Sequence, residues 1–196
     1  MSCETVAIHL LRKAEERGVE DITQMKLHKL LYYVQGYHLA LHGERAFPDR
    51  IKAYNHGPVA SALYGVLRRR TTFMQVLSAA FLSTIYPQAA QATLPAKTEQ
   101  IIDSVMDEFA HYSALELRAM THRESPWLAH CTSRTAETAD GSEITVDELQ
   151  DYFDVRLTEA YTEDVVRSAL SLNEQDYIRV PEHVKDEDAF VRWMMS

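Results

Sequence analysis

Histidine side chains are the first candidates for chemistry in this sequence. His38 and His42 are four residues apart, a spacing that places two imidazoles on one helix face where they can share a metal ion. No Glu follows His38 as in a zinc protease motif, and the sequence offers no obvious third ligand nearby. A metal-dependent hydrolase that uses this pair or His122 is therefore an alternative, and a packed or exposed histidine pair is the simpler interpretation.

Cys131 is the second candidate, because His130 precedes it. Adjacent residues rarely point at each other, so the pair is a poor nucleophile and base. The sequence also lacks a phosphate-binding glycine loop, a Cys-x-x-Cys pair and a Gly-x-Ser-x-Gly elbow. Since the common enzyme classes lack their markers, we predict a protein that is not an enzyme, with no catalytic residue, cofactor or metal.

Three short segments instead combine aromatic side chains with hydrogen-bonding groups: residues 26–35, 54–59 and 121–127. Tyr, Trp and Arg dominate the energetics of protein interfaces, so these segments predict a binding surface. The candidate partner-binding residues are Lys26, His28, Lys29, Tyr32, Tyr33, Gln35, Tyr54, His56, Gly57, Pro58, Thr121, His122, Glu124, Pro126 and Trp127.

A purely structural alternative accounts for the same residues. In it, the pair Gly57–Pro58 sets a turn and Trp127 fills the core. The polar side chains of Gln35, His122 and Glu124 then satisfy one another. The residue types alone are compatible with both interpretations.

Helical periodicity predicts the elements that position these residues. Residues 3–17 form a first helix that Gly18 stops, and residues 23–43 form a second that ends at Gly43. The apolar stripe of the second helix is wide and rich in aromatic residues, which indicates packing on more than one side. We expect this stripe to hold the fold and the polar edge of the helix to face a partner.

Further helices are predicted from proline and capping signals. Pro58 is expected to open a helix that ends at Arg68–Arg70, and Pro95 to open another with Ile101 and Phe109 on its inner face. A short helix should begin at Ser113. Residues 44–57 suggest a small extended segment or loop, and residues 71–94 have no clear assignment.

The last part of the chain has one strong signal. Thr145 and Glu148 form a capping box, so a helix should start there and reach about Leu157. Residues 132–142 precede it as a surface loop. Helical patches follow at 162–172 and 186–195, and the second is apolar enough to dock on the domain or on another subunit.

Composition favours a mainly α, single compact multi-helix domain with an extra C-terminal helical segment. The chain has 196 residues, of which 46% are hydrophobic and 25% charged, an ordinary globular profile. We place the helical domain at 1–157 and the C-terminal extension at 158–196. Two cysteines and the absence of a leader-like or membrane-spanning segment predict a cytoplasmic protein with no role in a membrane.

The net charge of −9 is unevenly distributed. Residues 1–70 contain 11 Lys+Arg and 7 Asp+Glu, and residues 71–196 contain 9 and 22, which gives +4 and −13. The acidic half disfavours nucleic acid as a partner, although a DNA-binding regulator that uses the basic half remains an alternative. A basic patch of Lys26, Lys29 and Arg68–Arg70 is expected to steer an acidic protein partner.

At the same three segments the sequence resembles the Panacea domain family, which includes SocA-like antitoxins and phage-associated GepA-like proteins. The resemblance rests on residues 22–40, 57–59 and 121–127, in the order and rough spacing of the family. It extends over about 6–153, and residues 71–94 have no counterpart in it.

The resemblance implies an antitoxin that neutralises a cognate toxin encoded nearby by direct binding. It also implies an adaptor function, in which the toxin is delivered to a ClpXP-type protease. It implies no catalytic residues. A homo-oligomer, and a place in a prophage or mobile element, are compatible with it.

Overall fold

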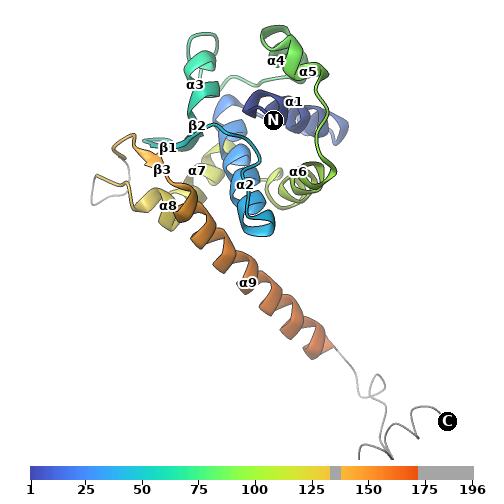
Figure 1. Ribbon diagram of the computed structural model, residues 1–196, viewed down its shortest axis with the longest axis vertical. Helices are drawn as coiled ribbons and strands as arrows, with labels where there is room; N and C mark the ends of the chain where they lie inside the picture. Colours follow the sequence, from blue (N-terminus) through green and yellow to red (C-terminus); the bar gives the residue numbers. More distant parts are fainter. Residues whose placement is uncertain (133–137, 172–196) are drawn as a thin grey trace, which may run out of the picture. The chain divides into compact units, whose positions relative to one another are not determined.

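A computed structural model describes residues 1–132 and 138–171, and within them the predicted mainly α fold is confirmed. The chain divides into two compact units, Met1–Leu157 and Thr158–Ser196. Figure 1 labels the helices and strands, of which α9 continues from the first unit into the second. They are, in chain order, α1 (Cys3–Glu16), α2 (Gln24–His42), β1 (Ile51–Tyr54), β2 (Gly57–Ala60), α3 (Ser61–Leu67), α4 (Ala79–Ile85), α5 (Pro87–Gln91), α6 (Ala96–Phe109), α7 (Ala114–Thr121), α8 (Ser125–Leu128), β3 (Glu143–Ile144) and α9 (Val146–Ser171).

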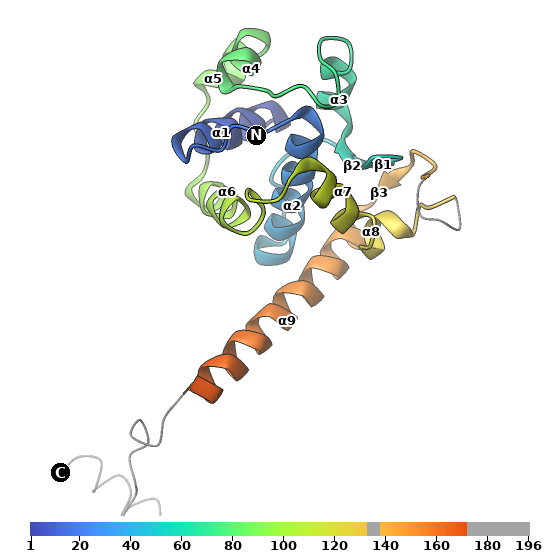
Figure 2. The same cartoon turned by 180° about the vertical axis from the view of Figure 1, so that it is seen from behind.

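Helix α2 lies at the centre of the first unit, between α6, α7 and β2 (Figures 1 and 2). Its predicted limits are confirmed, because the Thr23 hydroxyl accepts from the Lys26 amide and Gly43 ends the helix at φ +66°. Every side chain from 24 to 39 is buried. In a helix that is enclosed on all sides, each polar side chain needs a hydrogen-bond partner inside the protein. The polar residues of α2 are therefore expected to bind groups of neighbouring elements.

Helix α1 covers one flank of α2 and packs on α4, α5 and α6. The predicted helices at 3–17, at 95–109 and from Ser113 are confirmed, the last with a capping box between Ser113 and Glu116. The unassigned segment 71–94 contains α4 and α5.

The prediction that Pro58 opens a helix is wrong. Residues 57–60 form β2, which pairs antiparallel with β1, and β1 also pairs with β3, so the sheet order is β2-β1-β3. The Pro58 carbonyl accepts from the Lys29 ammonium at 2.9 Å instead of an amide one turn later. The helix therefore starts at Ser61, whose amide donates to Arg50 across the sheet edge.

The capping box that opens α9 is confirmed, since the Glu148 amide donates to the Thr145 hydroxyl and the Thr145 amide to the Glu148 carboxylate. The predicted end near Leu157 is wrong, because α9 continues to Ser171 with no glycine or proline to stop it. In the first unit, Leu149 and Phe153 of α9 are buried in the core. The predicted patch at 186–195 lies outside the described residues, and the packing of the C-terminal extension stays a prediction.

Candidate partner-binding site

The three segments selected from the sequence meet in the fold. Lys29 of α2 reaches β2, and a Cβ on Gly57 would lie 2.7 Å from Lys29 Cε and 2.9 Å from Thr121 Oγ1 of α7. Gly57 also has φ +93°, a conformation that favours glycine. Burial lowers the pKa of Lys29 well below its usual value, and Arg118 adds to the effect. Residues 26–35, 54–59 and 121–127 therefore form one packed junction around this glycine.

Glu124 is a second centre of the junction. It is buried just before α8, and its Oε1 accepts from the Tyr33 hydroxyl at 2.8 Å. Arg156 of α9 approaches the same oxygen at 3.5 Å and donates to Glu108 at 2.9 Å. Burial raises the pKa of Glu124 despite the hydrogen bonds and the cation. This carboxylate links α2, α8 and α9.

Trp127 fills the core, as the structural alternative expects, and its indole N–H donates to the Tyr54 carbonyl at 2.9 Å. The His122 ring stacks on it at 3.7 Å. The expected mutual bonding of Gln35, His122 and Glu124 is wrong for Gln35. That side chain instead makes two hydrogen bonds to the backbone of Phe47.

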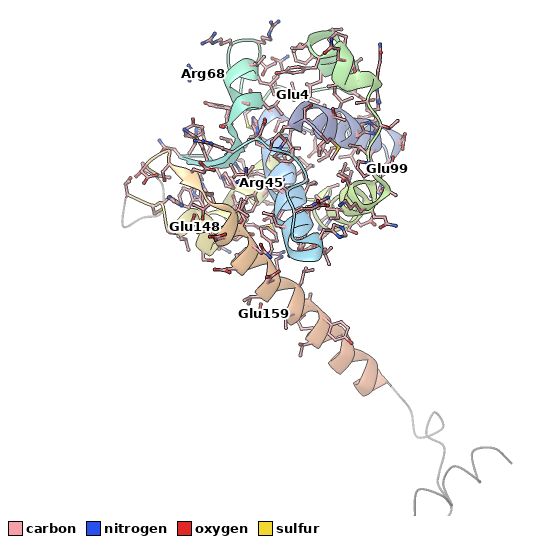
Figure 3. The ribbon with its side chains drawn as sticks, viewed as in Figure 1. Glu4, Arg45, Arg68, Glu99, Glu148 and Glu159 are labelled. Carbon is pink, nitrogen blue, oxygen red and sulfur yellow. The ribbon has the colours of Figure 1, made fainter. Side chains whose placement is uncertain are left out.

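The expectation of an exposed polar edge on α2 is also wrong. Lys26 is fully buried and donates to the Asp21 carboxylate at 2.6 Å and the Ala110 carbonyl at 2.8 Å. The predicted basic patch is correspondingly reduced to Arg68–Arg70, which are exposed at the end of α3 (Figure 3). Among the candidate residues, most lie in the interior and support the fold, so contact with a partner stays a prediction for them.

His28 is the most unusual of the buried polar residues. Neither of its ring nitrogens has a hydrogen-bond partner among the described residues, and its ring meets the Tyr64 ring edge-on at 5.8 Å. Burial and the neighbouring Lys29 lower the pKa of His28 to about 3, so the ring is neutral at physiological pH. Burial of an imidazole without a hydrogen-bond partner costs free energy. Through Tyr64, His28 contacts the surface formed by α3 and the β1–β2 turn.

That surface carries four aromatic rings, which we call the hairpin patch: Tyr54, His56, Tyr64 and Phe73. His56 is exposed in the β1–β2 turn and the other three are half-buried. Their ring centroids follow one another at 5.2–5.9 Å. Only Tyr54 and His56 were selected from the sequence, and the helical position of Tyr64 gave no signal. Phe73 belongs to the segment that had no assignment.

The hairpin patch lies in a positive environment. Burial lowers the pKa of His56, and Arg118 and Lys29 lower it further. The Arg118 guanidinium also donates to the Asn55 carbonyl in the same turn at 3.5 Å. Rigid aromatic rings beside arginine are typical of interface hot spots.

The histidine and cysteine candidates do not assemble into a site. His38 bridges the Glu44 carbonyl at 2.8 Å and the Thr98 hydroxyl at 3.2 Å, and burial lowers its pKa to about 4. Within the described ranges, no group of three or more His, Cys, Asp or Glu side chains is placed to hold a metal ion. Burial raises the pKa of Cys131, which does not favour a thiolate.

Comparison with known proteins identifies the family. The model of the antitoxin SocA-like, Panacea domain matches residues 27–128, about half of the chain, so the protein belongs to this family. The matched residues include the three segments of the junction except Lys26, and the family supports an antitoxin-type role. Neither the curated proteins nor the solved structures give a significant match. In the part of the chain that the structure describes, no helix combines the length and apolar character of a membrane span.

Proposed function

We propose that this protein is an antitoxin that binds a protein toxin encoded beside it and neutralises it by direct contact. The observation that carries the proposal is the family match over residues 27–128, which coincides with the segments that build the junction. An antitoxin-type role needs a binding surface for the toxin.

The hairpin patch is the surface next to the junction on which we expect the toxin to bind. The β1–β2 turn of the patch is fixed to the interior of the domain. Gly57 packs against Lys29 and Thr121, and the Trp127 indole donates to the Tyr54 carbonyl. A preformed surface loses little conformational entropy on binding, so its rings contribute more of their burial energy to affinity. Arg118 and the exposed Arg68–Arg70 favour an acidic face on the toxin.

Co-expression with the neighbouring gene tests the proposal. We expect the toxin to lose its effect on growth and to co-purify with this protein. His56→Ala and Phe73→Ala should each weaken binding by about tenfold or more, as expected for interface aromatics. Leu115→Ala is a matched control, because Leu115 is also a large exposed side chain, on α7 outside the patch. A neighbour that stays toxic and does not co-purify would contradict the proposal.

Delivery to a ClpXP-type protease is the finer form of this proposal. It predicts that the toxin disappears in cells that contain the protease and persists in cells that lack it. Neutralisation that is equally complete in both strains would instead favour occlusion of the toxin by binding alone.

A further inference from the structure

A groove between α8 and the start of α9 is a second surface with a different chemistry. It has a volume of about 360 Å³ and lies within residues 1–157, and its lining contains none of the rings of the hairpin patch. It is lined by Ser125, Pro126, Ala129, Glu148, Asp151, Tyr152 and Val155. The volume is at the lower end of ligand-sized sites, roughly 300–1,000 Å³, and suits a few side chains of a partner segment.

The groove is preformed. Glu124, immediately before α8, binds Tyr33 of α2 and Arg156 of α9, so the two walls are fixed to the same core. Arg156 also stacks over the Tyr33 ring at 5.7 Å. A partner therefore meets walls that are already in place.

Apolar side chains are exposed in the groove and next to it in the sequence, where Leu128 precedes the lining residue Ala129. Val155 on α9 is 57% exposed and Leu128 on α8 is 41% exposed, and both are among the large hydrophobic residues that the fold leaves accessible. Pro126 is buried in the groove floor. Val155 in the α9 wall and the exposed Ala129 in the α8 wall are suited to the apolar face of a helix laid between them.

The α9 wall of the groove contains two carboxylates, Glu148 and Asp151. Asp151 is exposed, and hydrogen bonds from Thr145 and His130 hold the pKa of Glu148 below its usual value although burial opposes them. Figure 3 labels Glu148 in the first turns of α9, beside α8. The nearby cation Arg156 is already paired with Glu108 and Glu124. Glu148 already contacts His130 at 3.2 Å, so among the described side chains that line the groove Asp151 is the carboxylate without a cationic partner.

We propose that this groove binds a cationic amphipathic helix of a partner protein, with Leu or Phe side chains between Ala129 and Val155 and Lys or Arg side chains against Asp151 and Glu148. The site is separate from the toxin-binding surface proposed above. The hairpin patch lies beside arginine side chains and favours an acidic partner, whereas the groove favours a basic one, so the two surfaces select different segments.

Synthetic peptides test the groove directly on the full chain. One fluorescein-labelled peptide of about 14 residues, roughly four helical turns, carries Leu and Phe on one face and Lys on the other. The second peptide has Glu in place of every Lys. Fluorescence anisotropy should detect binding of the Lys peptide, and the Glu peptide should bind at least about tenfold more weakly because of like-charge repulsion. Equal affinities would overturn the proposal.

Matched variants locate the binding. Ala129→Trp should fill the groove and abolish binding, whereas Ala119→Trp places the same ring on an exposed position of α7 and should leave it unchanged. Asp151→Lys should weaken binding by about tenfold, and Asp154→Lys, with the same charge change outside the lining, by about twofold. Circular dichroism first establishes that each variant is folded.

The outcomes are distinct. Equal losses in the two tryptophan variants, or in the two lysine variants, would place the peptide elsewhere and overturn the proposal. Absence of binding by the Lys peptide up to about 1 mM, an affinity of only about 4 kcal/mol, would also overturn it. Toxin neutralisation depends on the hairpin patch, so its success or failure is measured separately.

Discussion

At Gly57 two requirements coincide, a positive φ and the close approach of side-chain atoms. We expect Gly57→Ala to lower the free energy of unfolding by about 3 kcal/mol, from the cost of the left-handed conformation and from overpacking against Lys29 and Thr121. Urea denaturation measures the change. The terminal atoms of Lys29 can move aside, but its ammonium would then lose the Pro58 carbonyl.

Gly43→Ala is the control for the backbone contribution. Gly43 has φ +66°, and a Cβ there would meet no atom within 4 Å. It should cost only the conformational part, about 1 kcal/mol. If both variants lose the same stability, packing around Gly57 does not contribute and the junction is looser than described.

Glu124 gives a pH-dependent prediction. Burial raises its pKa in the folded protein above the unfolded value of about 4.3, so the folded state binds more protons between the two values. The stability due to Glu124 is therefore fully present below about pH 4.3 and is lost as pH rises through the folded pKa. Glu124→Gln removes this titration.

Urea unfolding of the two proteins from about pH 4.3 to about pH 7 measures the effect. The stability of Glu124→Gln relative to the wild type should increase as pH rises. A wild type that instead gains on the variant would mean that the attraction of Arg156 outweighs burial of the carboxylate, and the direction assigned to the pKa would be wrong.

At the scale of elements, the contact between α2 and α9 depends on Gly36 and Phe153. A Cβ on Gly36 would lie 2.1 Å from the Phe153 ring, which also meets the rings of Tyr32, Tyr33 and Tyr37. Alanine usually stabilises a helix interior by about 1 kcal/mol relative to glycine. We expect the clash to outweigh this gain, so that Gly36→Ala destabilises the protein by about 2 kcal/mol.

A double-mutant cycle isolates this contact. Phe153→Ala alone should cost about 4 kcal/mol through the cavity that it leaves. With the ring absent, Gly36→Ala should become neutral or stabilising, which gives a coupling energy of about 2 kcal/mol or more. Strict additivity would contradict direct packing of α9 on α2.

The elements that the sequence predicts well are those set by local signals. Periodicity and capping locate α1, α2, α6 and α7, because the determinants of each lie within one or two turns. The wrong prediction that Pro58 opens a helix shows the limit of such local signals. A proline fits the first turn of a helix and also a strand end, and the choice depends on pairing with β1 and on the Lys29 ammonium, which no local pattern reveals.

In the candidate site, too, the sequence predicts what depends on local residue types and does not predict what depends on long-range contacts. The residue types of segments 26–35, 54–59 and 121–127 indicated a shared role, and the structure brings the three segments together. Their burial could not be predicted, because Lys26 and Lys29 are paired with carbonyls of Ala110 and Pro58, far away in the sequence. Arg156 had a usable signal, because it is the first cation of α9 and follows four acidic residues in that helix.

At the scale of the whole molecule, the structure shows where the basic and acidic residues of the unevenly charged sequence lie. Exposed Arg68–Arg70 end α3, and carboxylates line the groove at the start of α9. Exposed charges a Debye length apart, about 8 Å at physiological salt, act almost independently. One surface can therefore favour an acidic partner and another a basic one although the net charge is −9.

The division of the chain after Leu157 leads to the last prediction. Leu149 and Phe153 of α9 are 2% and 0% exposed and complete the core of the first unit. A protein ending at Leu157 should therefore fold and unfold cooperatively, as monitored by circular dichroism. A protein ending at Thr145 lacks both side chains, at a cost of about 3–5 kcal/mol each, and should not fold, since typical domains have only 5–15 kcal/mol of stability.

The truncation that should fold, which ends at Leu157, also tests the C-terminal extension. Size-exclusion chromatography compares the assembly of residues 1–157 with that of the full chain. Reduced solubility without a change in assembly would support packing of residues 158–196 on the domain, and a smaller assembly would support packing between subunits. If residues 1–157 do not fold at all, the first unit is not self-sufficient, and the core contributed by Leu149 and Phe153 is not enough to close it.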